Sequence, residues 1–239
     1  MDSPFLTANW NNLLMINFRA DPALLKKYVP AGTELDTWNN THYISLVGFL
    51  FRDTRVKGIS FPLHRHFEEV NLRFYVRYND GNTWKRGVVF IKELVPKRLI
   101  TFVANTIYKE NYATLPMRHH WHMPDAATLQ VSYEWKVGSE WNYLRATAGR
   151  QAQHIQPGSE AEFITEHYWG YTQAGPAATA EYQVKHPQWK VHQVTGYDYY
   201  CNAHSLYGPG FAETLAQKPV SALLAEGSAI AVMPKRQLK

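Results

Sequence analysis

The sequence contains very little cysteine and no long hydrophobic run. A single cysteine, Cys201, excludes an intramolecular disulfide and any metal site built from several cysteines. No run of about 18 apolar residues exists, which excludes a membrane-spanning helix and predicts no membrane partner. Residues 1–21 lack a basic stretch followed by an apolar core and a small-residue cleavage site, so we expect no secretory signal. Together these absences predict a cytoplasmic protein.

Motifs for nucleotide binding and for serine hydrolases are also missing. Without GxSxG, a Walker loop or GxGxxG, an esterase, a nucleotide hydrolase and a dinucleotide enzyme have no support, and no cofactor is expected. The net charge is +5, but the 25 Lys and Arg residues are scattered along the chain, so no nucleic-acid partner is expected. Cys201 lies in a tyrosine-rich stretch and reads as a small packing residue, with a nucleophilic role as the alternative.

The chain reads as one domain over residues 1–239. It has no internal repeat, low-complexity block or Gly/Ser linker, and the turn-rich stretches at 156–160 and 173–180 are short enough to be loops. An apolar content of 45% supplies the material for a core. All-β domains of this length are common as single units.

Period-two patterns predict an extensive antiparallel sheet. Between Glu69 and Tyr78 the alternation places Val70, Leu72, Phe74 and Val76 on one face, expected to be core, and Glu69, Asn71, Arg73, Tyr75 and Arg77 on the other. Asp-Gly in the loop 79–82 predicts a hairpin with a partner strand at 87–95. Further strands are expected at 13–18, 43–51, 129–136, 141–148, 181–184 and 190–194.

Three helices are expected between the strands. Asp21 as an N-cap and Pro22 in the first turn predict a short helix through Tyr28. A second helix is expected from about 97 to 108, where Leu99, Ile100, Val103 and Ile107 recur at helical spacing. A capping box formed by Ser159 and Glu162 predicts a third helix over 159–167.

Five segments in order carry a resemblance to a known family. They are residues 10–36, FEEVNLRFYV at 67–76, RGVVFIKELV at 86–95, GSEAEFITEHYWGYT at 158–172 and HPQW at 186–189. With these the chain resembles the YqjF-like bacterial family of unknown function, within the acetoacetate-decarboxylase-like superfamily. The resemblance implies a mainly β (α+β) fold, an acetoacetate-decarboxylase-like antiparallel β barrel with a few flanking helices. It also implies a small-molecule cavity inside the barrel and a homo-oligomer.

The lysine that defines acetoacetate decarboxylase has no counterpart in this resemblance. In that enzyme a Pro-Lys-Lys motif supplies a Schiff-base lysine, whereas here the matching position is Tyr112, with Lys109 three residues earlier. A Schiff-base lysine must be neutral to attack a carbonyl, which requires a lowered pKa. Lys92 is the remaining candidate for catalysis, because alternation puts it on the face of Val88 and Phe90, either as a buried amine or as a strand-end lysine reaching water.

Glu69, Asn71 and Arg73 form the candidate binding group, joined by Tyr112 through the resemblance. Their spacing places them on one strand face, where Glu69 could act as acid or base and Arg73 could hold a substrate carboxylate. The alternative is a solvent-facing row of ion pairs. The sequence thus predicts a small-molecule-binding protein whose ligand could be a carboxylate. Two alternatives stay open: an enzyme acting on a small keto or carboxylic acid without a Schiff base, and a non-catalytic interaction scaffold.

Eleven histidines raise the question of a metal. The clusters are His64 with His66, and His119, His120 and His122, but neither resembles a known zinc motif, and we expect no metal site. Glu166 and His167 end the third expected helix, where a cation favours the helix dipole.

Overall fold

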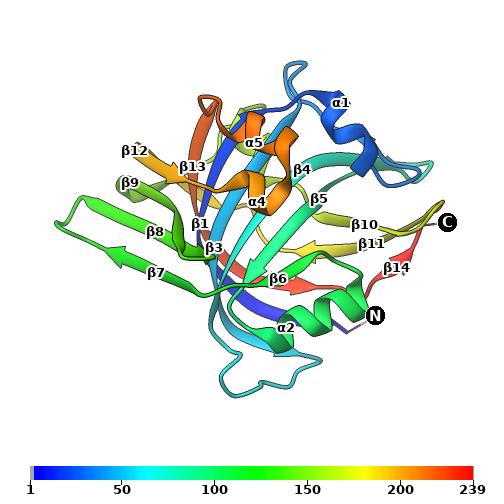
Figure 1. Ribbon diagram of the computed structural model, residues 1–239, viewed down its shortest axis with the longest axis horizontal. Coiled ribbons are helices and arrows are strands. Elements are labelled where there is room, and N and C mark those ends of the chain that lie inside the picture. The colour runs from blue at the N-terminus through cyan, green and yellow to red at the C-terminus, as the bar shows by residue number, and fades with distance from the viewer. Residues whose placement is uncertain (1–2, 239) are drawn as a thin grey trace.

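Long twisted strands make up most of the structure, a computed structural model that describes residues 3–238 (Figure 1). The helices are short: α1 (Pro22–Leu25), α2 (Arg98–Val103) with a π turn after it (Ala104–Tyr108), α3 (Glu160–Thr165), α4 (Ala203–Tyr207) and α5 (Pro209–Leu215). The strands are β1 (Leu6–Arg19), β2 (Glu34–Leu35), β3 (Tyr43–Val56), β4 (Phe67–Asn79), β5 (Trp84–Val95), β6 (Tyr112–Thr114), β7 (Met117–His122), β8 (Thr128–Val137), β9 (Glu140–His154), β10 (Trp169–Gly175), β11 (Ala178–Lys185), β12 (Lys190–Tyr200), β13 (Ser221–Val232) and β14 (Arg236–Gln237).

Strand pairing closes part of the sheet into a ring. The order is β11, β10, β5, β4, β3, β1 and β13, and β13 pairs back to β11 at Val184–Val232. Neighbours in the ring are antiparallel, apart from the parallel pair β5–β10. The expected mainly antiparallel β fold with a few helices is therefore confirmed.

Gly87 allows the parallel contact between β5 and β10. It lies opposite Trp169 in the register, and a Cβ atom at this position would lie 2.5 Å from the carbonyl oxygen of Trp169. Only a residue without a side chain permits this approach of the two backbones.

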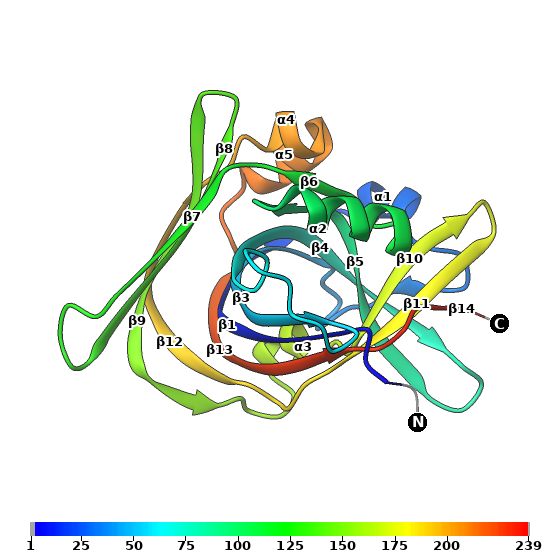
Figure 2. The same cartoon turned by 90° about the horizontal axis from the view of Figure 1, so that it is seen from below.

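A second layer extends from the ring. Beyond β13 the sheet continues into β12, β9, β8 and β7, which splay away from the ring in Figure 2. One core cluster lines the inside of the ring, and a second lies between the ring's outer surface, this layer and helices α4 and α5. Both faces of β4 are consequently buried: Val70 and Leu72 belong to the outer cluster, whereas Phe67 and Tyr75 belong to the inner one.

The local patterns in the sequence predicted many of these elements. The hairpins β4–β5 and β8–β9 and the N-caps Asp21 and Ser159 are confirmed. The apolar stripe of α2 departs from expectation, because Leu99 and Ile107 are exposed at the mouth of a cavity rather than packed in the core. Sequence patterns did not predict β7, β10, β13 or helices α4 and α5.

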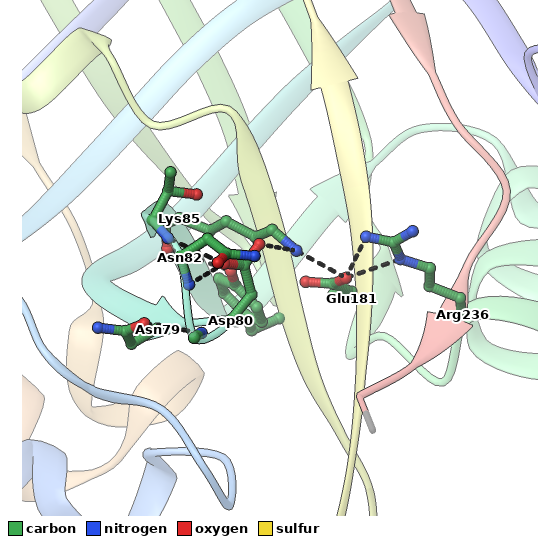
Figure 3. A network of polar contacts seen from close by, with 9 residues as sticks. Asn79, Asp80, Asn82, Lys85, Glu181 and Arg236 are labelled. Atoms are coloured by element: carbon green, nitrogen blue, oxygen red, sulfur yellow. Dashed lines mark hydrogen bonds and ion pairs between the residues drawn. The ribbon is translucent and has the colours of Figure 1, made fainter.

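A polar network ties the β4–β5 turn to the C-terminal strands (Figure 3). Lys85 lies 3.1 Å from Asp80 and 3.7 Å from the buried Glu181 of β11, and Arg236 of β14 bonds Glu181 at 2.7 Å. The network holds one edge of the ring against the end of the chain. Among residues 3–238, no helix has the length and apolar character needed to cross a membrane.

Candidate functional site

A cavity of about 460 Å³ lies inside the ring. Its walls come from the ring strands, and α2 together with the loop between β3 and β4 borders its mouth. The walls are largely aromatic and aliphatic, with Trp10, Leu13, Phe49, Phe51, Phe67 and Phe90 among them. Such a lining favours an apolar ligand body.

Strand register brings four polar side chains together on one wall. Asn71 of β4 lies opposite Glu93 of β5, and Glu93 lies opposite Tyr112 of β6. Glu69 is two residues from Asn71 and shares its face. Asn71 Nδ2 donates a hydrogen bond to Glu69 Oε1 at 3.0 Å, and the Tyr112 hydroxyl donates one to Glu69 Oε2 at 3.1 Å.

Glu110 adds a third carboxyl group to this wall. It lines the same cavity just before β6 and accepts a hydrogen bond from Thr172 Oγ1 at 2.5 Å. Burial, opposed in part by a coulombic attraction to Lys235, raises its pKa above the usual value. The three carboxyl groups therefore influence one another's protonation.

Burial makes these acids weak. It raises the pKa of Glu69 to about 7, against the hydrogen bonds from Asn71 and Tyr112. Burial raises the pKa of Glu93 well above its usual value, and the neighbouring charges of Glu110 and Glu69 add to this rise. Burial also raises the pKa of Tyr112 well above 10. Burial therefore favours the protonated form of Glu93, which can donate a hydrogen bond, and near neutral pH Glu69 is poised to gain or lose a proton.

Arg73 lines the cavity but does not pair with Glu69. Its Nη2 donates to the carbonyl oxygen of Ile164 at 3.3 Å and contacts Met15 Sδ at 3.6 Å, and among the described residues no carboxylate forms a salt bridge with it. The structure places Glu69, Asn71 and Arg73 around one cavity, but Arg73 and Glu69 form no ion pair there.

Several buried polar atoms beside the cavity have no partner. Within residues 3–238, Asn71 Oδ1, Arg73 Nε, Glu93 Oε2 and His167 Nδ1 make no hydrogen bond. An unsatisfied buried polar group is unusual in proteins and requires an explanation. Here, all four atoms belong to residues that line the same space.

His167 is buried beside Asp36, which no local sequence signal indicated. The His167 Nε2 lies 3.3 Å from Asp36 Oδ2, and Arg86 Nε lies 2.7 Å from the same oxygen. Burial lowers the pKa of His167 to about 4. Burial alone would raise the pKa of Asp36, but the hydrogen bonds from His167 and Arg86 lower it to about 2. A neutral His167 therefore donates through Nε2 to an ionised Asp36.

Lys92 lies outside the cavity, contrary to the face that alternation predicts. A β-bulge in the β4–β5 register between Leu72 and Arg73 reverses the facing of β5, so Phe90 and Glu93 face inward while Lys92 faces outward. The Lys92 ammonium donates to the carbonyl oxygen of Leu206 at 2.5 Å. The bulge is also why Glu93 was missed in the sequence, and Glu110 in its loop carried no pattern that could have found it.

The other residues singled out in the sequence are dispersed. Among residues 3–238, no group of three His, Cys, Asp or Glu side chains is placed to hold a metal ion. His119 instead contacts Glu68 at 2.6 Å. Burial raises the pKa of Cys201 to about 12, which favours the unreactive thiol over the thiolate.

Comparison with known protein families shows to which family the chain belongs. The profile of DUF2071, described as an uncharacterized conserved protein, matches residues 7–229. The chain belongs to the DUF2071 family. This DUF2071 chain is 32% identical over 110 residues to the uncharacterized protein YqjF of Bacillus subtilis (strain 168), which covers 46% of the chain and 44% of YqjF. The matched region thus spans less than half of that relative. The resemblance to the YqjF-like family is confirmed.

Solved structures share the fold of the DUF2071 chain. Acetoacetate decarboxylase of Legionella pneumophila has a TM-score of 0.65 at 14% identity and covers 100% of this chain and 88% of its own. The enduracididine biosynthesis enzyme MppR complexed with pyruvate has a TM-score of 0.69 at 11% identity. This match covers 100% of the present chain and 92% of MppR. An acetoacetate decarboxylase-like enzyme from Sphingomonas wittichii RW1 has a TM-score of 0.66 at 13% identity. This match covers 100% of the present chain and 94% of that enzyme. At these identities the likeness shows the acetoacetate-decarboxylase-like fold alone.

Proposed function

We propose that this DUF2071 chain binds a small organic molecule with an apolar body and one polar head, a carboxylate being the leading choice, without forming a Schiff base. The observation that carries the proposal is a group of atoms beside one cavity that have no hydrogen-bond partner within residues 3–238: Asn71 Oδ1, Arg73 Nε and Glu93 Oε2. An unsatisfied buried group costs about 1–3 kcal/mol, and a bound head group would supply its partner.

The remainder of the cavity supports the same ligand shape. Small-molecule sites measure roughly 300–1,000 Å³ and combine apolar walls with a few placed polar groups. The positive charge of Arg73 and a protonated Glu93 both favour a carboxylate over an ammonium group. The structure of MppR with pyruvate shows that one protein of this fold accepts a small carboxylate.

Calorimetric titration with hexanoate, hexanol and hexylamine tests the proposal. We expect hexanoate to bind best, and Arg73→Ala to weaken it by about tenfold or more, because one charge-assisted contact contributes about that much. The matched control is Arg77→Ala, an exposed arginine on the same strand that pairs with Glu34. If none of the three compounds binds, or if both variants behave alike, the proposal fails and an interaction scaffold becomes the better reading.

An enzymatic role is the second candidate, favoured by one observation. Glu69 has its pKa raised by burial to about 7, which suits a general acid or base at neutral pH. Proton exchange at the methyl group of pyruvate in deuterated water, followed by proton NMR, tests this role. Exchange that the wild type accelerates and Glu69→Gln abolishes would support an enzyme, whereas equal exchange in both would leave binding as the function.

A further inference from the structure

Large apolar side chains are exposed on two segments that border the mouth of the cavity. They are Ile59, Phe61 and Leu63 on the loop between β3 and β4, and Leu99, Phe102 and Ile107 on α2 and the turn after it. The exposed fraction reaches 84% for Leu63 and 66% for Phe102. Figures 1 and 2 both place this loop and α2 at the same end of the molecule. Large apolar side chains exposed together around one cavity mouth are typical of an interaction surface.

These two segments, taken together with the end of β3 and the residues on either side of α2, have an excess of positive charge. Residues 52–66 and 97–109 contain Arg52, Arg55, Lys57, Arg65, Lys97, Arg98 and Lys109, and Asp53 is the one acid among them. Their net charge is +6, whereas the whole chain has +5, so the remaining residues sum to −1. Basic residues that look scattered in the sequence are therefore concentrated by the fold, and most of them are exposed.

Apolar side chains inside a basic surround fit an anionic lipid surface. Peripheral membrane proteins insert apolar side chains into the interface while Lys and Arg contact anionic head groups. A nucleic acid would use the charge but gives no role to exposed aliphatic side chains such as Leu63. A symmetric contact with a second copy would place two surfaces of +6 against each other, which like-charge repulsion opposes.

We infer that this end of the molecule docks on an anionic lipid surface, with Leu63 and Phe102 inserted and the mouth of the cavity facing the lipid. The inference goes beyond ligand binding and rests on the surface alone, so it stands or falls without a ligand in the cavity. It also replaces the expectation of no membrane partner, which depended on the absence of a spanning segment.

Co-sedimentation with vesicles tests this docking. The probe is phosphatidylcholine vesicles with roughly 30% phosphatidylglycerol, compared with pure phosphatidylcholine, at low and high salt. We expect binding to the anionic vesicles only, weakened by salt, and reduced about tenfold or more by Leu63→Ser/Phe102→Ser and by Arg55→Glu/Arg98→Glu. Matched controls elsewhere on the surface are the exposed residues Val220→Ser and Arg150→Glu, which should bind like wild type.

Three results would overturn the inference. These are no binding by the wild type, equal binding to both vesicle types, or loss of binding in the controls as large as in the test variants. Light scattering after gel filtration tests the alternative that a second copy of this chain covers the surface. If the wild type is a dimer that Leu63→Ser/Phe102→Ser converts to monomer, while no variant binds vesicles, the surface is an interface between copies. All substituted side chains are exposed, so folding should be retained, and circular dichroism of each variant checks this.

Discussion

The Tyr112 hydroxyl donates a hydrogen bond to Glu69 Oε2 at 3.1 Å, inside a cavity shared with Glu93 and Glu110. The sequence resemblance predicts that Tyr112 stands at the position of the reactive lysine of acetoacetate decarboxylase. A phenol whose pKa is raised well above 10 by burial can donate a hydrogen bond but cannot form an imine. The polar wall of the cavity therefore offers carboxyl groups and a phenol as hydrogen-bonding groups.

Borohydride reduction in the presence of acetoacetate should leave the protein unmodified. Lys57, at the mouth, is the one lysine among the described residues that line the cavity. Lys92 lies outside the cavity, where its ammonium donates a hydrogen bond to the carbonyl oxygen of Leu206. Intact-mass spectrometry reads the result, with a Schiff-base aldolase as positive control. A stoichiometric adduct mapped to Lys92, Lys109 or Lys57 would restore the decarboxylase interpretation.

Glu69→Gln should stabilise the protein at high pH relative to wild type. Because burial raises the folded pKa of Glu69 from 4.5 to about 7, the folded state binds the proton more tightly, and stability is lost as pH rises through this window. The loss is on the order of 3 kcal/mol, since one pKa unit corresponds to about 1.4 kcal/mol. Urea unfolding between pH 4.5 and 8 measures it, with the exposed Glu226→Gln as control. A constant difference between Glu69→Gln and wild type across this range would contradict the assignment.

His167 should produce the opposite pH dependence. Burial depresses its folded pKa from 6.5 to about 4, so the unfolded chain binds the proton more tightly and stability falls as pH drops from 6.5 to 4. His167→Gln removes this loss, so its stability relative to wild type should improve by up to about 3 kcal/mol between pH 6.5 and 4. Urea unfolding between pH 4 and 6.5, with the exposed His154→Gln as control, provides the comparison. Parallel curves for wild type and His167→Gln would show that His167 is not buried in its neutral form.

Gly87→Ala should destabilise the ring. Its added Cβ would lie 2.5 Å from the Trp169 carbonyl oxygen, which forces β5 and β10 apart and costs about 1–3 kcal/mol, as overpacking does elsewhere. The matched control is Gly196→Ala on β12, where a Cβ meets no atom within 4 Å. A lower urea midpoint with an unchanged slope is expected for Gly87→Ala only. Equal midpoints for the two variants would mean that the parallel pair does not need the glycine.

Local signals in the sequence were sufficient for elements that depend on neighbouring residues. The Asp-Gly turn produced the β4–β5 hairpin, and Asp21 caps α1 by accepting a hydrogen bond from the Ala23 amide at 2.8 Å. The placement of Glu69 and Asn71 on one face followed from period-two geometry, which a single strand determines by itself. Both side chains are buried, as an internal cavity requires.

Local sequence patterns failed to predict the position of a side chain where contacts between distant parts of the chain determine it. The bulge near Lys92 exists in the pairing of two strands and has no signature in either one, yet it turns Lys92 outward and Glu93 inward. The contact of His167 with Asp36 joins residues 131 positions apart. Local periodicity carries no information on such a pair.

What the sequence determined by itself was the family, the strand-rich fold, and the type of polar group carried by β4. These depend on motif order and on alternation, both of which are local properties of the chain. The tertiary structure alone decided that the ring closes through β11 and β13, that three carboxyl groups share one cavity, and that basic and apolar side chains gather at its mouth. The physical reason is that burial, which shifts the pKa values and leaves polar atoms unpartnered, arises only when distant strands enclose a common space.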